Sequence, residues 1–196
     1  MKKDIKGTIL KAVIIVVIIL VALFLMKGTI YRTVVKYEDG GGRKSYELKD
    51  DKLTSRINQS LPNDESLDEN IDIETIIDFS LNMTTDMLEL SAEYVDNEPV
   101  KAFENGGANF VGYAAFTAAT ANYLIKRFGL DKEWEAKPKK GKFYLFGNNM
   151  SKNAKDGWFK DHDFVIIRNK SPKEKIYVDP TAFDRFGVRR VDKRQK

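Results

Sequence analysis

The chain has 196 residues and a formal net charge of +4, with 42% hydrophobic residues, 32% charged residues, one histidine and no cysteine. Without cysteine it can form no disulfide, no thiolate metal site and no cysteine nucleophile, and one histidine cannot build a multi-histidine zinc site within a single chain. The length and apolar content predict one packed domain of ordinary size and exclude a wholly disordered chain.

The charge is unevenly distributed along the chain. Residues 1–36 carry a net +6, residues 37–98 a net −12 and residues 99–196 a net +10. The first block flanks an apolar run, which indicates a membrane, and the acidic middle would repel phosphates, so no nucleic-acid partner is expected. The basic tail is expected to be a solvated face or a contact for acidic lipid or protein. Its cations are Arg185, Arg189, Arg190, Lys193, Arg194 and Lys196.

An apolar run near the amino terminus predicts a single-pass membrane anchor over residues 1–27. Every residue from Ala12 to Met26 is apolar, and extension back to Gly7 adds only one charge, Lys11. About 20 helical residues cover the roughly 30 Å of a bilayer core, and a lysine near one end can snorkel to the interface. A cleaved secretory signal would need small residues after the run, where Phe24-Leu25-Met26 stands instead.

The membrane orientation is set only weakly by the flanking charges. Lysines precede the apolar run, but Lys27, Arg32 and Lys36 follow it closely, so the positive-inside rule hardly discriminates. The layout of a signal anchor favours an inner amino terminus. We therefore expect a single-pass protein of the bacterial inner membrane, with the C-terminal domain outside the cytoplasm.

Residues 28–71 are expected to form a juxtamembrane segment and an acidic linker. A β-like run, Thr29 to Tyr37, leads to the three glycines Gly40 to Gly42, which predict a flexible turn because the context of a phosphate-binding loop is missing. Residues 49–70 are polar, acidic and poor in aromatic residues.

Residues 72–196 are predicted to form an α+β domain, with helices first and a mostly antiparallel sheet after them. Apolar residues at three- and four-residue steps follow a capping Asp72, and a second, alanine-rich helix is expected from Asn109 to Gly129. Four short runs rich in β-forming residues follow, separated by turn-forming residues. They are Trp134 to Lys140, Lys142 to Phe146, Phe164 to Asn169 and Lys175 to Val178.

Two polar residues are expected to meet at the ends of the last two strands. If these strands form a hairpin with Arg168 opposite Lys175, His162 and Asp179 lie diagonally on one face. The aspartate could then orient the histidine ring, whereas a register slip of one residue would separate them. A nucleophile for such a pair would belong at the start of the alanine-rich helix, where the amide groups and the helix dipole stabilise negative charge.

That helix start, Gly106 to Ala115, together with His162 and Asp179-Pro180-Thr181, resembles the transglutaminase-like branch of the papain-like cysteine enzymes. In this family a cysteine opens the central helix, often followed by Gly-Tyr-Ala. A His-x-x-Val strand and an Asp-Pro-Thr strand end complete a Cys-His-Asp triad. The resemblance covers about residues 72–187 and implies that His162 and Asp179 are the remnant of a triad, with Phe110 at the nucleophile position.

Phenylalanine has no nucleophilic atom, so the resemblance implies a catalytically inactive, membrane-anchored domain that acts as a binding or assembly module. Its partners would be membrane lipid and a protein or peptide. Asn109 is either the helix cap or an oxyanion donor. Two alternatives stay open: a cysteine-type amidase, protease or acyltransferase whose nucleophile has been replaced by Phe110, and a structural subunit of a membrane complex.

Plainer roles exist for the same residues. His162 could cap a strand, and Asp179 before a proline could simply start a turn. No metal or cofactor is predicted: Asp161, His162 and Asp163 are adjacent, and neighbouring strand residues point to opposite faces. The aromatic residues around them are expected to line the core or a cleft. These are Trp134, Trp158, Phe143, Phe146, Phe159 and Phe164.

Overall fold

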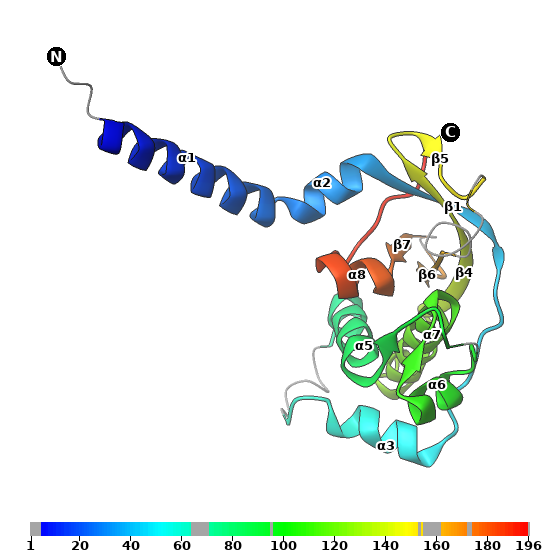
Figure 1. The fold of residues 1–196 in the computed structure, drawn as a ribbon. Helices are drawn as coiled ribbons and strands as arrows, with labels where there is room; N and C mark the ends of the chain where they lie inside the picture. Colours follow the sequence, from blue (N-terminus) through cyan, green and yellow to red (C-terminus); the bar gives the residue numbers. More distant parts are fainter. Residues whose placement is uncertain are drawn as a thin grey trace.

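The computed structural model describes residues 5–63, 71–94, 96–152, 154, 162–171 and 174–195. It confirms an α+β architecture with helices packed on an antiparallel sheet (Figure 1). The helices are α1 (Ile5–Leu25), α2 (Lys27–Val34), α3 (Asp51–Gln59), α5 (Ile73–Met87), α6 (Pro99–Asn105), α7 (Phe110–Arg127) and α8 (Pro180–Phe186). The strands are β1 (Val35–Gly42), β2 (Glu89–Leu90), β3 (Gly107–Ala108), β4 (Trp134–Leu145), β5 (Asn148–Asn149), β6 (Asp163–Asn169) and β7 (Lys175–Val178).

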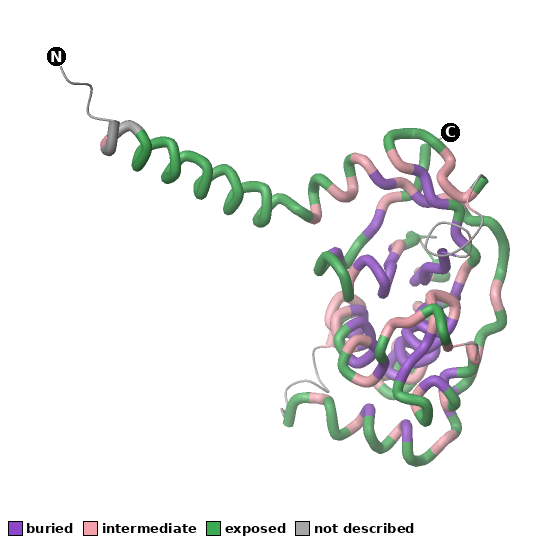
Figure 2. Tube along the Cα trace, viewed as in Figure 1, coloured by how far each residue is buried: buried purple, intermediate pink, exposed green. Residues whose placement is uncertain are grey.

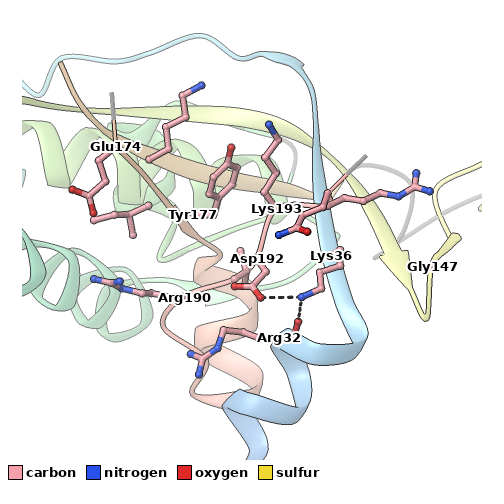
Figure 3. Close-up of a pocket in the computed structure, with 13 residues that line it drawn as sticks. Arg32, Lys36, Gly147, Glu174, Tyr177, Arg190, Asp192 and Lys193 are labelled. Carbon is pink, nitrogen blue, oxygen red and sulfur yellow. Dashed lines mark hydrogen bonds and ion pairs between the residues drawn. The ribbon is translucent and has the colours of Figure 1, made fainter. Parts of the chain in front are cut away.

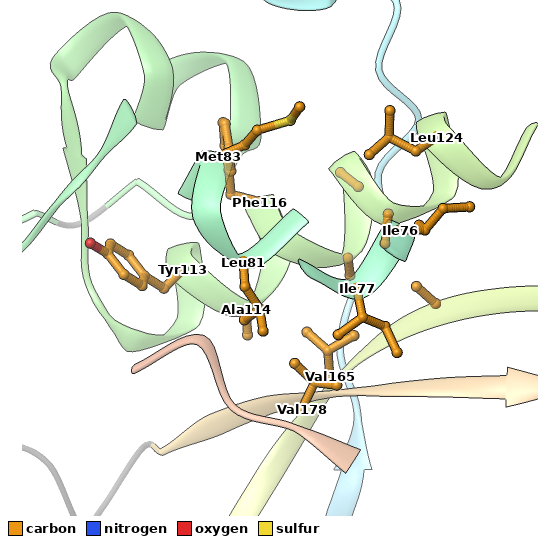
Figure 4. Packing of buried hydrophobic residues seen from close by; sticks show 14 of the residues in the cluster. Ile76, Ile77, Leu81, Met83, Tyr113, Ala114, Phe116, Leu124, Val165 and Val178 are labelled. Atoms are coloured by element: carbon orange, nitrogen blue, oxygen red, sulfur yellow. The ribbon is translucent and has the colours of Figure 1, made fainter. Parts of the chain in front are cut away.

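The alanine-rich helix α7 is the buried centre of the domain, as predicted. It begins after the cap Asn109, and Gly129 follows its end with a φ of 71°, a conformation that suits glycine. Small side chains let α5 and the sheet approach it closely, and the buried hydroxyls of Thr84 and Thr117 lie 2.8 Å apart between α5 and α7. Figure 4 shows this core, with Leu81 of α5 and Ala114 of α7 above Val165 of β6.

The main sheet has the strand order β1-β4-β6-β7, with every neighbouring pair antiparallel. The two runs expected on either side of Gly141 form one continuous strand, β4. Its first half pairs with β6 and its second half with β1. Gly141 allows a close approach here, because a Cβ atom at this position would lie 2.2 Å from the carbonyl oxygen of His162.

The C-terminal tail joins the two outer strands of this sheet. The amide of Val191 donates to the carbonyl of Tyr177 in β7, and the amide of Tyr37 in β1 donates to the carbonyl of Asp192, both at 2.9 Å. Val188 and Val191 are buried in a second apolar cluster inside the curved sheet. The basic tail is therefore more than a solvated face, since its backbone and apolar residues belong to the fold.

Much of the segment expected to be a linker is part of the folded domain. β1 pairs with β4 along its length, and a bulge between Asp39 and Gly41 takes the place of the expected flexible turn. α3 buries Leu53 and Ile57 in the same core as α5 and α7. Residues 64–70 lie outside the described part of the chain.

The β-like run from Thr29 to Tyr37 is helical in its first part, because α2 extends to Val34 before β1 starts. β-branched residues favour strands only when a neighbouring strand is available to pair with them. Thr33 instead donates its hydroxyl to the carbonyl of Thr29, 2.8 Å away, within the helix. The strand begins at Val35, where pairing with Leu145 starts.

The apolar helix α1 extends away from the domain, with the side chains of its described part exposed (Figure 2). In the described residues no single helix is long and apolar enough to cross a membrane. Ile9–Leu25 and Lys27–Val34, which meet at 63°, could do so together by length and composition.

The packing of α3 gives a direct test of the domain boundary. Leu53 is fully buried, so we expect Leu53→Ala to lower the free energy of unfolding by about 3 kcal/mol. The matched control Ser55→Ala changes an exposed side chain on the same helix and should stay within about 0.5 kcal/mol. Urea unfolding of the full chain in detergent measures both, and equal values for the two variants would show that α3 adds nothing to the core.

Candidate active site

The three residues expected to form a site come from separate elements that converge at the start of α7. Phe110 is the first residue of α7, His162 directly precedes β6, and Asp179 directly follows β7 and caps α8. The predicted hairpin register is confirmed, with Arg168 opposite Lys175. This register brings the residues before β6 and after β7 to the same end of the sheet.

His162 and Asp179 form a fully buried pair. Nε2 of His162 lies 2.5 Å from Oδ2 of Asp179, and both side chains are 0% exposed. The amide of Gly141 in β4 also donates to the carbonyl of His162 at 2.9 Å, which fixes the backbone next to the ring. The aspartate therefore orients the imidazole, as the hairpin geometry predicted.

The carboxylate of Asp179 accepts hydrogen bonds on both oxygens. Oδ1 accepts from the amides of Thr181 and Ala182 at 2.9 and 3.0 Å, and Oδ2 accepts from the hydroxyl of Tyr37 at 2.5 Å as well as contacting His162. Burial alone would raise the pKa of Asp179. The charge and hydrogen bond of His162, together with the hydrogen bonds from Tyr37 and the Ala182 amide, outweigh this effect and hold the pKa below its ordinary value. Asp179 is thus ionised and His162 donates from Nε2.

Tyr37 is a site residue that the sequence interpretation missed. It is fully buried, its hydroxyl lies 2.6 Å from that of Tyr31 in α2, and its ring contacts that of His162 at a centroid distance of 5.6 Å. Burial and the neighbouring charge of Asp179 raise the pKa of Tyr37 well above its usual range, so the phenol keeps its proton and donates it. The alternation of apolar and charged residues from Val35 to Glu38 was the available signal for a half-buried strand.

Phe110 lies beside His162, with ring centroids 6.1 Å apart and planes at 34°. Phe143 of β4 approaches the same imidazole at 5.5 Å, edge to face. The imidazole of His162 is therefore in contact with aromatic rings. The side chain of Phe110 presents only carbon atoms to it.

Asn109 is the helix cap. Its Oδ1 accepts from the amides of Val111 and Gly112 at 2.9 and 3.0 Å, and its Nδ2 donates to the carbonyl of Tyr94 at 2.7 Å. The Asn109 side chain is therefore committed to capping α7 through Oδ1 and to the Tyr94 carbonyl through one of its two Nδ2 hydrogens.

Packing and hydrogen bonding also explain the Gly-Tyr-Ala sequence near the start of α7. A Cβ atom at Gly112 would lie 2.7 Å from Cβ of Ala108, so no larger residue fits there without a shift. The buried Tyr113 donates to the carbonyl of Leu88 at 2.6 Å. These contacts hold α7 against the segments before it.

Asp163, the residue after His162, does not share the surroundings of the imidazole. Asp163 is buried and forms two hydrogen bonds with the guanidinium of Arg43, at 2.6 and 3.0 Å. Asp161, Trp158 and Phe159 lie outside the described residues. Among the residues that are described, no group of three or more histidines and carboxylates could hold a metal ion. Of the other aromatic residues, Phe164 is buried, Trp134 packs against the core and Phe146 is exposed.

Comparisons with protein-family models, with curated proteins and with solved structures find no match for this chain. The arrangement itself combines an ionised carboxylate, an oriented imidazole and the amino-terminal end of a long helix. These are the surroundings in which a thiol becomes a thiolate. With Phe110 in that place, the same groups form a buried polar network that ties β1, β6, β7 and α8 together.

The hydrogen bond from Tyr37 predicts a specific acid sensitivity. The pKa of Asp179 is lower in the folded state than in the unfolded chain. The ionised carboxylate therefore stabilises the fold fully above the ordinary aspartate pKa of about 4, and this stabilisation is lost as the pH falls through the folded-state pKa. Tyr37→Phe removes one donor and raises that pKa, so acid unfolding should begin at a higher pH. Near neutral pH the variant should lose about 2 kcal/mol.

Thermal unfolding followed by circular dichroism from neutral to acidic pH measures both effects. Tyr144→Phe is the control, because the Tyr144 hydroxyl donates to Glu38, a carboxylate outside the buried network. An acid midpoint in Tyr37→Phe equal to that of the control would contradict the role of the Tyr37 hydroxyl.

Proposed function

We propose that this chain is a membrane-anchored domain of transglutaminase-like arrangement that lacks catalysis and serves as a binding or assembly module. The observation that carries the proposal is the position of Phe110, at the start of α7 and in ring contact with His162. In a Cys-His-Asp arrangement this is the place of the nucleophile, and here it holds an aromatic ring.

Loss of the covalent nucleophile removes the chemical step of amide or ester transfer. A general base and its orienting carboxylate cannot replace it, because they act by activating that nucleophile. Removing one member of such a triad typically lowers the rate by several orders of magnitude. The threonine hydroxyls of α7 offer no substitute, because Thr117 and Thr120 lie about two and three turns beyond the helix start and are both buried.

The burial of the His162–Asp179 pair supports a structural role for it. Both side chains are 0% exposed, and the carboxylate also caps α8 and accepts from Tyr37. A binding module needs a rigid frame, and a network that joins several elements by short buried hydrogen bonds supplies one.

A second candidate, an enzyme of the same arrangement, is favoured by one observation. Asp179 orients His162 through Nε2, as the carboxylate of a Cys-His-Asp triad does. Orientation of an imidazole by a carboxylate is a component of general-base catalysis. A thiol introduced at position 110 tests whether position 110, His162 and Asp179 are arranged as in a triad, which both candidates require.

The Phe110→Cys variant tests the arrangement, because the chain has no other cysteine. Near the helix start and beside His162 the introduced thiol should have a pKa well below the usual value of about 8.5. We therefore expect fast labelling by iodoacetamide at mildly acidic pH, and a decrease of at least about tenfold when His162→Ala is added.

Val111→Cys is the matched control, since it adds a thiol one residue later without the contact to His162. Equal labelling of the two thiols, independent of His162, would contradict a triad-like arrangement. Turnover of peptide amides or esters by the unmodified chain that is abolished by His162→Ala would instead establish the enzyme and overturn the inactive module.

Membrane anchoring is the other part of the proposal, and the exposed apolar surface of α1 supports it. Soluble proteins rarely expose a continuous apolar surface of this extent, because its hydration is unfavourable. α2 then continues at an angle of 63° and packs against the domain, where the rings of Tyr31 and Phe186 have centroids 5.7 Å apart.

The full chain should float with uncharged lipid vesicles and stay bound in high salt. The double variant Val16→Asp with Ile19→Asp places two carboxylates within α1, each costing about 3 kcal/mol at the centre of a bilayer, and should remain unbound. Ser55→Asp with Gln59→Asp on α3 adds the same charge to the domain and should float normally. Release of the unmodified chain by salt would contradict insertion.

A further inference from the structure

A basic groove lies where α2 joins the domain. It has a volume of about 970 Å³ and runs between the start of β1, the outer strand β7 and the C-terminal tail (Figure 3). The elements around it are held firmly, because the tail pairs with both β1 and β7. The groove is therefore a built feature of the fold.

Six cationic side chains line the groove, and half of them are paired. Their ion-pair partners are Asp192 for Lys36, Glu74 for Arg190 and Glu38 for Arg194.

The other three cations, Arg32, Lys175 and Lys193, make no ion pair within the described part of the chain. Glu174 is a carboxylate in the same lining, so the unpaired charge along the groove is positive. The groove therefore suits an anionic ligand.

The position of the groove points to the source of that ligand. Arg32 follows Leu25, the last residue of α1, by seven residues in a helical segment. Seven residues of helix measure about 10 Å, and the 63° bend shortens the part of this length that lies along the axis of α1. If α1 is inserted in a bilayer, Arg32 and the groove beside it lie at the level of the lipid headgroups.

We propose that this groove binds the anionic headgroups of phospholipids in the membrane that holds α1, so that the domain is fixed against the bilayer surface. The inference rests on the membrane anchoring proposed above. Arg32 and Lys193 would contact headgroup phosphates. Lys36 of β1 would keep its pair with Asp192 and its hydrogen bond to the carbonyl of Arg32, which together connect α2 with the tail. Basic residues next to a membrane segment are attracted to anionic lipid in this way.

Single-cysteine labelling of the full chain in nanodiscs tests the proposal. A fluorophore is attached to Gln195→Cys in the groove lining and, as the control, to Gln59→Cys on α3 at the other end of the domain (Figure 1). Lipids with a nitroxide on the headgroup quench a fluorophore that lies at the surface. Adding about 30% phosphatidylglycerol to phosphatidylcholine should raise quenching of the groove label at least about threefold and leave the α3 label unchanged.

Charge variants show whether the groove itself is responsible. Arg32→Gln with Lys193→Gln should abolish the effect of phosphatidylglycerol. The matched pair Lys52→Gln with Lys101→Gln removes the same charge from α3 and α6, and should preserve it. Raising NaCl to about 0.5 M should also weaken the effect, because the interaction is electrostatic.

Three outcomes would overturn the proposal. The first is equal quenching in neutral and anionic nanodiscs. The second is loss of the effect in both charge variants alike. The third is a loss of quenching of the groove label when inorganic phosphate, an acidic peptide or an oligonucleotide is added, larger than the loss caused by chloride at equal ionic strength. That result would assign the groove to a soluble anion. Failure of membrane anchoring is detected separately, because the chain would then not float with uncharged vesicles.

Discussion

The carboxylate of Asp179 is the interaction on which the rest of the arrangement depends. It lies at the end of β7, caps α8 through two amides, orients His162 before β6 and accepts from Tyr37 in β1. A buried charge is tolerated only when hydrogen bonds and an opposite charge replace its hydration. Because its donors come from separate elements, satisfying this one group fixes how those elements meet.

The same network links the domain to the proposed membrane segment. Tyr37 carries the connection, since its hydroxyl contacts Asp179 on one side and Tyr31 of α2 on the other. α2 in turn packs against α8, and Lys36 at the start of β1 pairs with Asp192 of the tail. The orientation of α2, and with it the direction in which α1 leaves the domain, is therefore tied to the buried site and to the basic groove.

Local patterns predicted the elements that carry their own signals. Asp72 and Asn109 cap helices where expected, and the bounds of β7 agree with the predicted run. The hairpin register on which the prediction was conditional is present, and it places His162 next to Asp179. The segment from Thr29 to Gln59 was misjudged, because the pairing of β1 with β4 and the burial of Leu53 in the main core depend on partners far along the chain.

The amino-acid sequence was enough to establish the absence of a thiol, the apolar run, the helices α5 and α7 and the strands that follow them. These follow from composition and from short-range periodicity, which involve only neighbouring residues. The candidate residues Phe110, His162 and Asp179 came instead from an assumed hairpin register and from the resemblance to the transglutaminase-like family. Tertiary contacts decided that Tyr37 completes the site and that the tail joins β1 to β7. Both depend on contacts between residues far apart in the sequence, which exist only in the folded chain.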